Sequence, residues 1–202
     1  MLITGESGVG KEIAARLVHA GGRRASRPFV TLNCAGVPET LLESELFGHT
    51  RGSFTGAVRD RDGLLEMANG GTLFMDEVGE MSLRMQALLL RFLETGEIQR
   101  VGADGRNAIV NVRLITATNR DLLQQIRAGA FREDLYYRLN VIHIAIAPLR
   151  ERREDVPLLV ESFLARYAAV YETQAPEMST EALKCLVEYH WPGNVRELRN
   201  II

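Results

Sequence analysis

Residues 2–20 read LITGESGVGKEIAARLVHA, and this stretch decides the fold. It begins with a short apolar run typical of a strand, and residues 12–19 carry apolar side chains at the three-and-four spacing of a helix. The GESGVGK between them fits G-x-x-x-x-G-K, in which backbone N–H groups and a helix N-terminus surround phosphates and the lysine adds positive charge. The predicted phosphate-binding residues are Gly5, Glu6, Ser7, Gly8, Val9, Gly10, Lys11 and Glu12. The alternative is a glycine-rich turn without a ligand.

Beyond residue 20, predicted strands and helices continue to alternate. The strands are 29–33, 72–75, 112–117 and 141–146, and the helices are 39–47, 82–95 and 122–128. Glycines at 48, 96 and 129 stand where helix C-terminal caps are expected. This alternation predicts an α/β fold, with a parallel sheet sandwiched by helices.

The strand signal ends after Pro148. The charged stretch PLRERREDVP follows, and helices are predicted at 156–171, at 180–189 and from Asn194 onward. We therefore expect an α/β nucleotide-binding core at 1–148 and a small C-terminal helical lid at 149–202. The sheet starts without a lead-in segment and the last helix is short, so we expect a fragment of a longer polypeptide.

Composition narrows the class of protein. The chain has 202 residues, 46% of them apolar, with 24 basic and 26 acidic side chains and a net charge of -2. Without a cationic excess, nucleic acid is not the expected partner. No apolar run approaches the roughly 20 residues that span a bilayer, and no signal peptide is evident, so we expect a cytoplasmic protein with no membrane contact. Neither cysteine lies in a CxxC motif, and the four histidines lack metal-ligand spacing, so we expect reduced core thiols and no histidine-bound metal.

An acidic pair ends the strand in GGTLFMDE, residues 70–77. Asp76 would hold Mg²⁺ directly or through water, and Glu77 would orient and polarise an attacking water molecule. The alternative is an exposed pair that caps the next helix. Glu12 stands where many phosphate loops place a serine or threonine for Mg²⁺, and a water molecule could take that role.

Polar residues also end the predicted strand in VRLITATN, residues 112–119. They are suited to sensing a γ-phosphate or its attacking water. The alternative is a helix N-cap formed by Asn119 or Asp121.

Two arginines, Arg132 and Arg138, follow in FREDLYYR, residues 131–138. On a helix they would lie about 120° apart, so they cannot form one straight stripe. An i,i+4 ion pair between Asp134 and Arg138 is the alternative, but it would leave Arg132 unexplained. Arginines supplied to the nucleotide of a neighbouring subunit would explain both.

These motifs, in this order, closely resemble those of a known family, together with LNCAGVPETLLESELFGH, GSFTGA, FREDLYYRLNVI and WPGNVRELRN. The family is the central AAA+ P-loop NTPase domain of bacterial sigma-54-dependent transcriptional activators, and the similarity covers essentially the whole chain. It implies an ATP- and Mg²⁺-dependent motor that remodels the sigma-54 RNA polymerase holoenzyme, working as a homo-oligomeric ring, a hexamer. DNA contact is then expected only through a domain absent from this chain.

The resemblance also implies roles for individual residues. Glu12 after the lysine is usual in the family. Asn33 resembles the polar partner of the catalytic Glu77, although it could be a strand-end residue in a turn. The resemblance further implies a first sensor at Thr118 and Asn119 and arginine fingers at Arg132 and Arg138. It implies a second sensor at Arg196, which could otherwise be a solvated helix residue. A second pore loop is expected within 100–110.

GSFTGA is the most specific motif, and the resemblance makes it the loop that contacts sigma-54. Its residues are Gly52, Ser53, Phe54, Thr55, Gly56 and Ala57. Ser53 replaces the usual alanine, and the segment that helps enclose adenine is missing before the first strand. Phe54 could also fold back onto its own domain. The alternatives to a sigma-54 motor are another AAA+ remodeller, or a nucleotide-binding regulatory module with vestigial hydrolysis.

Overall fold

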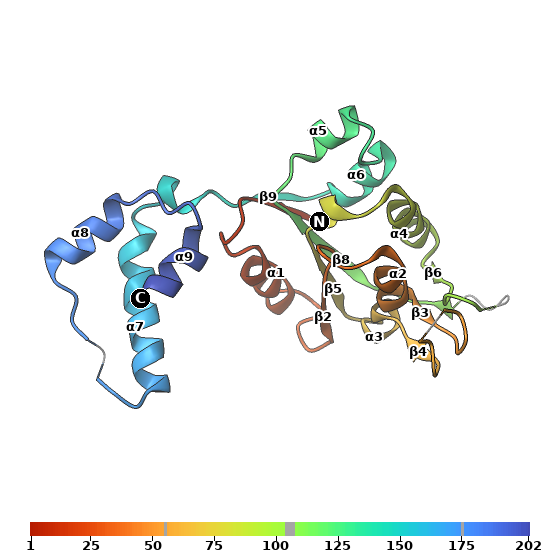
Figure 1. The fold of residues 1–202 in the computed structure, drawn as a ribbon, viewed down its shortest axis with the longest axis horizontal. Coiled ribbons are helices and arrows are strands. Elements are labelled where there is room, and N and C mark those ends of the chain that lie inside the picture. Colours follow the sequence, from red (N-terminus) through yellow and green to blue (C-terminus); the bar gives the residue numbers. More distant parts are fainter. Residues whose placement is uncertain (55, 104–107, 175) are drawn as a thin grey trace. The chain divides into compact units, whose positions relative to one another are not determined.

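The chain folds into two compact units (Figure 1). The computed structural model describes residues 1–54, 56–103, 108–174 and 176–202. The first unit comprises Met1–Thr4 with Glu12–Ile144, and the second comprises Gly5–Lys11 with Ala145–Ile202. The glycine-rich loop at residues 5–11 therefore packs with the C-terminal segment.

A five-stranded sheet in the order β2-β5-β8-β1-β9 forms the centre of the first unit. The strands are β1 (Leu2–Thr4), β2 (Phe29–Asn33), β5 (Thr72–Asp76), β8 (Arg113–Thr118) and β9 (His143–Ala145). The pairs β2–β5, β5–β8 and β1–β8 are parallel, so their carboxyl ends share one edge. Strand β5 is buried along almost its whole length, as expected for a strand covered on both faces.

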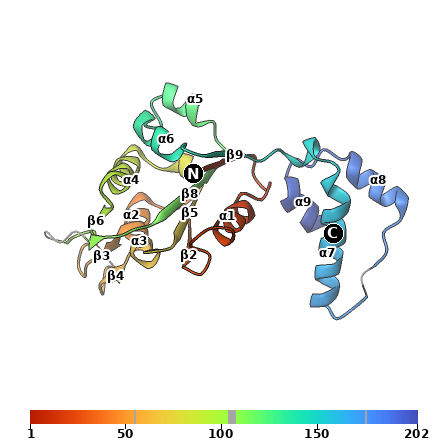
Figure 2. The same ribbon diagram turned by 180° about the vertical axis from the view of Figure 1, so that it is seen from behind.

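Helices lie on both sides of this sheet. Figures 1 and 2 show α1 on one side of the strands, and α2 and α4 on the other. The helices are α1 (Lys11–Ala20), α2 (Glu39–Phe47), α3 (Leu64–Met67), α4 (Leu83–Thr95), α5 (Leu122–Arg127) and α6 (Glu133–Leu139). Gly96 ends α4 in the left-handed conformation, with φ 70°, as the cap pattern predicts. The predicted α/β architecture is confirmed.

Two short hairpins extend this architecture. One pairs β3 (Gly48–His49) with β4 (Arg61–Asp62), and the other pairs β6 (Glu97–Ile98) with β7 (Ala108–Ile109), both antiparallel. The segment 48–63, which contains GSFTGA, thus forms a hairpin between α2 and α3. Sequence periodicity did not predict these strands, because two residues are too few to show an alternation.

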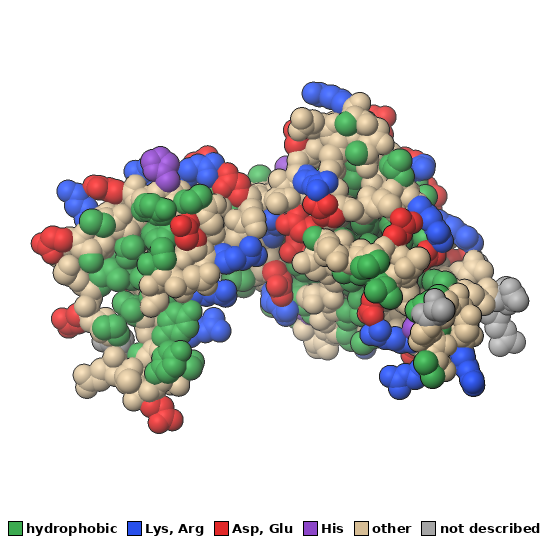
Figure 3. Space-filling view, viewed as in Figure 1, with side chains coloured by type: hydrophobic (Ala, Val, Ile, Leu, Met, Phe, Trp, Pro, Cys, Tyr) green, Lys and Arg blue, Asp and Glu red, His purple; other side chains and the backbone are tan. Residues whose placement is uncertain are grey.

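The second unit has its own core. Its helices are α7 (Asp155–Val170), α8 (Thr180–Glu188) and α9 (Asn194–Ile201), and the buried core side chains are Leu149, Val156, Val160, Trp191 and Leu198. Apolar side chains also reach its surface (Figure 3), with Val170, Tyr171 and Ile201 each more than half exposed. Cys185 is exposed on α8, so the prediction that both cysteines are core residues is wrong for this one.

Within the described ranges, no helix has the length and apolarity needed to cross a membrane.

Candidate functional site

The glycine-rich loop has the backbone that its sequence pattern requires. Gly8 and Gly10 have φ angles of 81° and 105°, which side-chain-bearing residues rarely adopt. A Cβ at Gly8 would lie 2.4 Å from the carbonyl oxygen of Gly193, so only glycine allows this close approach. The Lys11 side chain is buried, and its Nζ donates hydrogen bonds to the carbonyl oxygens of Gly5 and Glu6 at 3.0 and 3.2 Å.

Lid residues contact this loop within the second unit. Arg196 donates from a guanidinium nitrogen to Ser7 Oγ at 3.0 Å, and its backbone N–H donates to the Gly8 carbonyl at 3.3 Å. Arg152 donates to the Val9 carbonyl at 2.9 Å. Arg196, singled out from its sequence motif, is therefore in direct contact with the loop.

The acidic pair lies at the carboxyl edge of the sheet in the first unit. Asp76 is the last residue of β5, and its register partner is Asn33, the last residue of β2. Glu77 follows in the left-handed conformation, with φ 53° and ψ 45°. Its Oε2 accepts a hydrogen bond from the backbone N–H of Asn119 at 3.2 Å. Residues from three neighbouring strand ends thus meet at one edge.

The polar residues at the ends of β8 and β2 make local hydrogen bonds. Thr118 ends β8, is fully buried, and accepts a hydrogen bond from the Arg120 N–H at its Oγ1. The N-cap of α5 is Asp121, which accepts from two backbone N–H groups, so the alternative of a cap applies to Asp121 and not to Asn119. Asn33 Oδ1 accepts from the Ala35 N–H at 2.9 Å, which is the turn geometry considered as its alternative role.

Cys34 lies directly beside this acidic pair. Its side chain is 3% exposed, and its N–H donates to the Asp76 carbonyl at 3.0 Å. Burial, reinforced by the negative charges of Asp76 and Glu77, raises the pKa of the thiol to about 12. The thiol is therefore protonated and unreactive at neutral pH.

The predicted helical geometry of the two arginines requires a correction. Arg132 has φ -80° and ψ 132° and is the N-cap of α6, so the two residues do not lie on one helix. The considered pair of Asp134 with Arg138 is not the one found, because Asp134 accepts from both Nε and a terminal nitrogen of Arg132, at 3.0 and 2.6 Å. Arg138 instead lies 3.8 Å from the carboxylate of Glu94. Both guanidinium groups are substantially exposed, at 41% and 56% of the side chain.

Glu12 lies on the first turn of α1. Its carboxylate pairs with Arg16 one turn later, with 2.7 Å between the closest atoms. Both side chains are about half exposed, so this pair is a surface contact of small energetic weight.

The described residues of the GSFTGA loop contact one another and the hairpin that carries them. The N–H of Gly52 donates to the Ala57 carbonyl, and that of Ser53 donates to the Thr50 carbonyl. The ring of Phe54 meets the buried ring of His49 edge-on, with 5.1 Å between centroids. The considered alternative, in which Phe54 contacts its own domain, is thus realised in this conformation. Gly56 has φ 105°, Ala57 is buried, and Thr55 lies outside the described residues.

The two hairpins contact each other. Val101 donates from its N–H to the Gly48 carbonyl and accepts at its carbonyl from the Thr50 N–H. Arg100 forms ion pairs with Asp62 and Glu66, at 2.6 and 2.7 Å. The predicted second loop within 100–110 therefore starts against the base of the first, and its residues 104–107 lie outside the described part of the chain.

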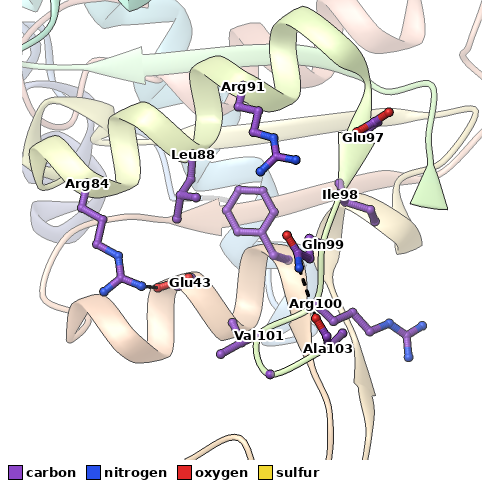
Figure 4. Close-up of a pocket in the computed structure, with 12 residues that line it drawn as sticks. Glu43, Arg84, Leu88, Arg91, Glu97, Ile98, Gln99, Arg100, Val101 and Ala103 are labelled. Carbon is purple, nitrogen blue, oxygen red and sulfur yellow. Dashed lines mark hydrogen bonds and ion pairs between the residues drawn. The ribbon is translucent and has the colours of Figure 1, made fainter. Parts of the chain in front are cut away.

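A cavity of about 280 Å³ lies beside the second hairpin (Figure 4). It lies between α2, α4 and residues 97–103, and three arginines line it, at positions 84, 91 and 100. Arg84 reaches across to Glu43 at 2.9 Å. Sequence analysis gave no indication of this cavity, because its lining comes from three separate segments.

Residues 1–145 match the family model described as the Sigma-54 interaction domain, and residues 150–202 match the one described as an AAA+ ATPase lid domain. The chain belongs to the Sigma-54 interaction domain family. This membership confirms the predicted family, and the two matches together confirm the AAA+ fold.

Relatives of known name agree with this membership. All 202 residues align with the phenol regulator MopR of Acinetobacter guillouiae at 54% identity, and with the Nif-specific regulatory protein of Klebsiella pneumoniae at 55%. The chain spans only 36% and 38% of those proteins. The structure of NtrX from Brucella abortus in complex with ATP has a TM-score of 0.89 at 41% identity, covering 98% of this chain and 45% of NtrX.

Proposed function

We propose that this chain is the ATP-hydrolysing motor domain of a sigma-54-dependent transcription activator and that it remodels the sigma-54 RNA polymerase holoenzyme. The observation that carries the proposal is the GSFTGA motif, which lies between the paired strands β3 and β4 in a member of the Sigma-54 interaction domain family. The acidic pair belongs to another segment, at the end of β5, so hydrolysis and partner contact can use different residues.

Nucleotide binding is assigned to the glycine-rich loop. Its positive-φ glycines and the buried Lys11 fit a phosphate-binding loop, and the complex of the related NtrX with ATP supports ATP as the ligand. Arg196 would act as the second sensor from its position against Ser7.

Hydrolysis is assigned to the sheet edge. Carboxylate oxygens fit Mg²⁺, which prefers oxygen ligands, so Asp76 would hold that ion. When bound, Mg²⁺ neutralises charge on the phosphoryl oxygens. Glu77 would orient and polarise the attacking water, with Asn33, Thr118 and Asn119 around it as polar neighbours.

A ring of identical subunits completes the assignment. The exposed guanidinium groups of Arg132 and Arg138 would act on the nucleotide of the neighbouring subunit. We propose a hexamer working in the cytoplasm, with DNA bound only through a separate domain.

The partner contact is assigned to the loop at residues 52–57, with Thr55 and Phe54 at its centre. A loop that transmits force should change the coupled output when altered, and should leave hydrolysis nearly intact. The glycines on either side, Gly52 and Gly56, supply the backbone freedom for movement.

Phe54→Ala tests this assignment. We expect ATP hydrolysis within several-fold of the wild type, but loss of co-migration with sigma-54 in the presence of ADP and aluminium fluoride. Glu77→Gln is the matched control, because it should lose hydrolysis while its loop is unchanged. Normal sigma-54 binding and promoter opening by Phe54→Ala would contradict the sigma-54 assignment. Absence of phosphate release by the wild type would favour a regulatory module instead.

A further inference from the structure

The glycine-rich loop is tied to the lid through the side chain of Glu6. Arg150 donates from both terminal guanidinium nitrogens to the two carboxylate oxygens of Glu6, at 2.6 and 2.8 Å. Asn194 donates from Nδ2 to Oε2 of the same carboxylate at 3.0 Å and to the Ser7 carbonyl at 3.1 Å. A bidentate charged pair fixes orientation as well as distance, so the contact defines the position of this part of the loop.

Asn194 makes these contacts from a buried position and with an unusual backbone conformation. It is fully buried, and its φ of 52° is a conformation that glycine adopts far more readily. Its Oδ1 accepts a hydrogen bond from the Leu149 N–H at 2.8 Å, and its Nδ2 donates both bonds to the loop. The amide therefore joins the start of the lid to two consecutive loop residues, which no glycine could do.

The charge of Glu6 is opposite to what phosphate binding alone requires. Hydrogen bonds from Arg150 and Asn194 hold the pKa of Glu6 at about 2, so the carboxylate is ionised at neutral pH. A negative charge beside a phosphate-binding loop repels an anionic ligand. The presence of Glu6 in the loop is thus better explained by its contacts with Arg150 and Asn194 than by any attraction to nucleotide.

We infer that Glu6, Arg150 and Asn194 are positioning residues through which the lid fixes the phosphate-binding loop in its binding conformation. The inference rests on the proposed nucleotide binding, gives Glu6 a different role in it, and adds Arg150 and Asn194, which lie within quoted motifs but had been given no role. Because the loop is fixed from the lid, a change that loosens either side of this cluster should weaken nucleotide binding.

Glu6→Gln gives the sharpest test, since a charge effect and a positioning effect change the affinity for nucleotide in opposite directions. Removing a negative charge should by itself tighten the binding of an anion, whereas loss of the charged pair should loosen the loop. We expect the Kd for a fluorescent ADP derivative to rise by about tenfold, the order expected when a hydrogen bond between charged groups is lost. Glu154→Gln is the matched control, because it removes the same charge from an exposed residue at the start of α7. Its Kd should equal or fall slightly below that of the wild type.

Asn194→Asp provides a second test. It keeps the oxygen that accepts from Leu149 but places a carboxylate against Glu6, so nucleotide binding should weaken by at least as much as in Glu6→Gln. Gln174→Glu, which adds the same charge at an exposed lid residue outside α9, is its control. Emission from Trp191, which is buried in the lid core, checks that each variant is folded.

A double-mutant cycle of Glu6→Gln with Arg150→Met separates positioning from two independent charge effects. The combined change should weaken binding little more than either single change, because both break the same pair. Unchanged or tighter binding by Glu6→Gln, or strict additivity in the cycle, would overturn the inference. Failure of the wild-type protein to bind the ADP derivative would instead overturn the proposed function.

Discussion

Glu77 is the residue at which local geometry and proposed chemistry are most closely linked. It follows the last residue of β5 in the left-handed conformation, where a side chain crowds the backbone. Such conformations are common at functional sites, where the surrounding structure maintains them against their cost. Here the turn directs the carboxylate toward the backbone N–H of Asn119 on the neighbouring strand end.

Replacement of Glu77 should therefore reveal that strain. Glu77→Gly should be more stable than Glu77→Ala by about 1 kcal/mol, because glycine adopts a positive φ without steric crowding. Both variants remove the carboxylate, so their difference isolates the backbone. Urea unfolding of the two proteins measures it. Equal stabilities would mean that the surrounding structure relaxes to a different backbone in the variants.

Sequence alone predicted the acidic pair and the loop lysine, because their residue types follow a strand in a fixed order. It could not predict Arg150 or Asn194, since their importance comes from contacts across more than 140 positions of sequence. The ion pair considered as an alternative for Asp134 was also not the one found. Helical spacing favoured Arg138, but Arg132 lies before the helix and reaches back to the same carboxylate.

Among the elements, the lid helix α9 depends most directly on a charged contact. Its first residue, Asn194, and the nearby Arg150 share the carboxylate of Glu6, which lies outside the lid in sequence. Loss of that charge should loosen the packing of α9 against the loop.

We expect this packing to be sensitive to acid. The pKa of Glu6 is lowered from 4.5 to about 2 in the folded chain, so its contribution to stability is complete above about pH 4.5 and is lost as the pH falls toward 2. Thermal midpoints measured by Trp191 emission should fall more steeply across that window in the wild type than in Glu6→Gln. Parallel curves for the two proteins would show that the Glu6 carboxylate does not contribute.

Several elements were predicted almost to the residue. Helix α4 has clear helical periodicity, strands β1 and β2 are mostly apolar, and a glycine follows each of α2 and α4. The hairpins that carry the two loops were not predicted. Their register depends on contacts such as the one between Val101 and Gly48, which local patterns do not encode.

At the scale of the whole molecule, the proposed machine needs more than one chain. The proposed binding and hydrolysis residues belong to the glycine-rich loop, the lid and the sheet edge. Arg132 and Arg138 are exposed and pair with acidic side chains in the contacts described above. Their proposed ligand is a nucleotide held by another copy.

Mixing two inactive variants tests this arrangement. Arg138→Ala lacks a finger and Lys11→Ala lacks a phosphate-binding lysine, so neither alone should hydrolyse ATP efficiently. Together they should recover part of the activity, because some interfaces then pair an intact loop with an intact arginine. Phosphate release measured against mixing ratio is the readout. If mixed rings form and no activity returns, the arginines do not act between subunits.

The contrast between the two cysteines gives the natural chain a built-in labelling site. Cys34 is sealed beside the acidic pair with its pKa raised to about 12, whereas Cys185 is exposed on α8. Because the thiolate is the species that reacts with maleimides, a dye should attach to Cys185 and leave Cys34 unmodified. The chain has no other cysteine, so a spectroscopic probe can be placed on the lid alone without any engineered substitution.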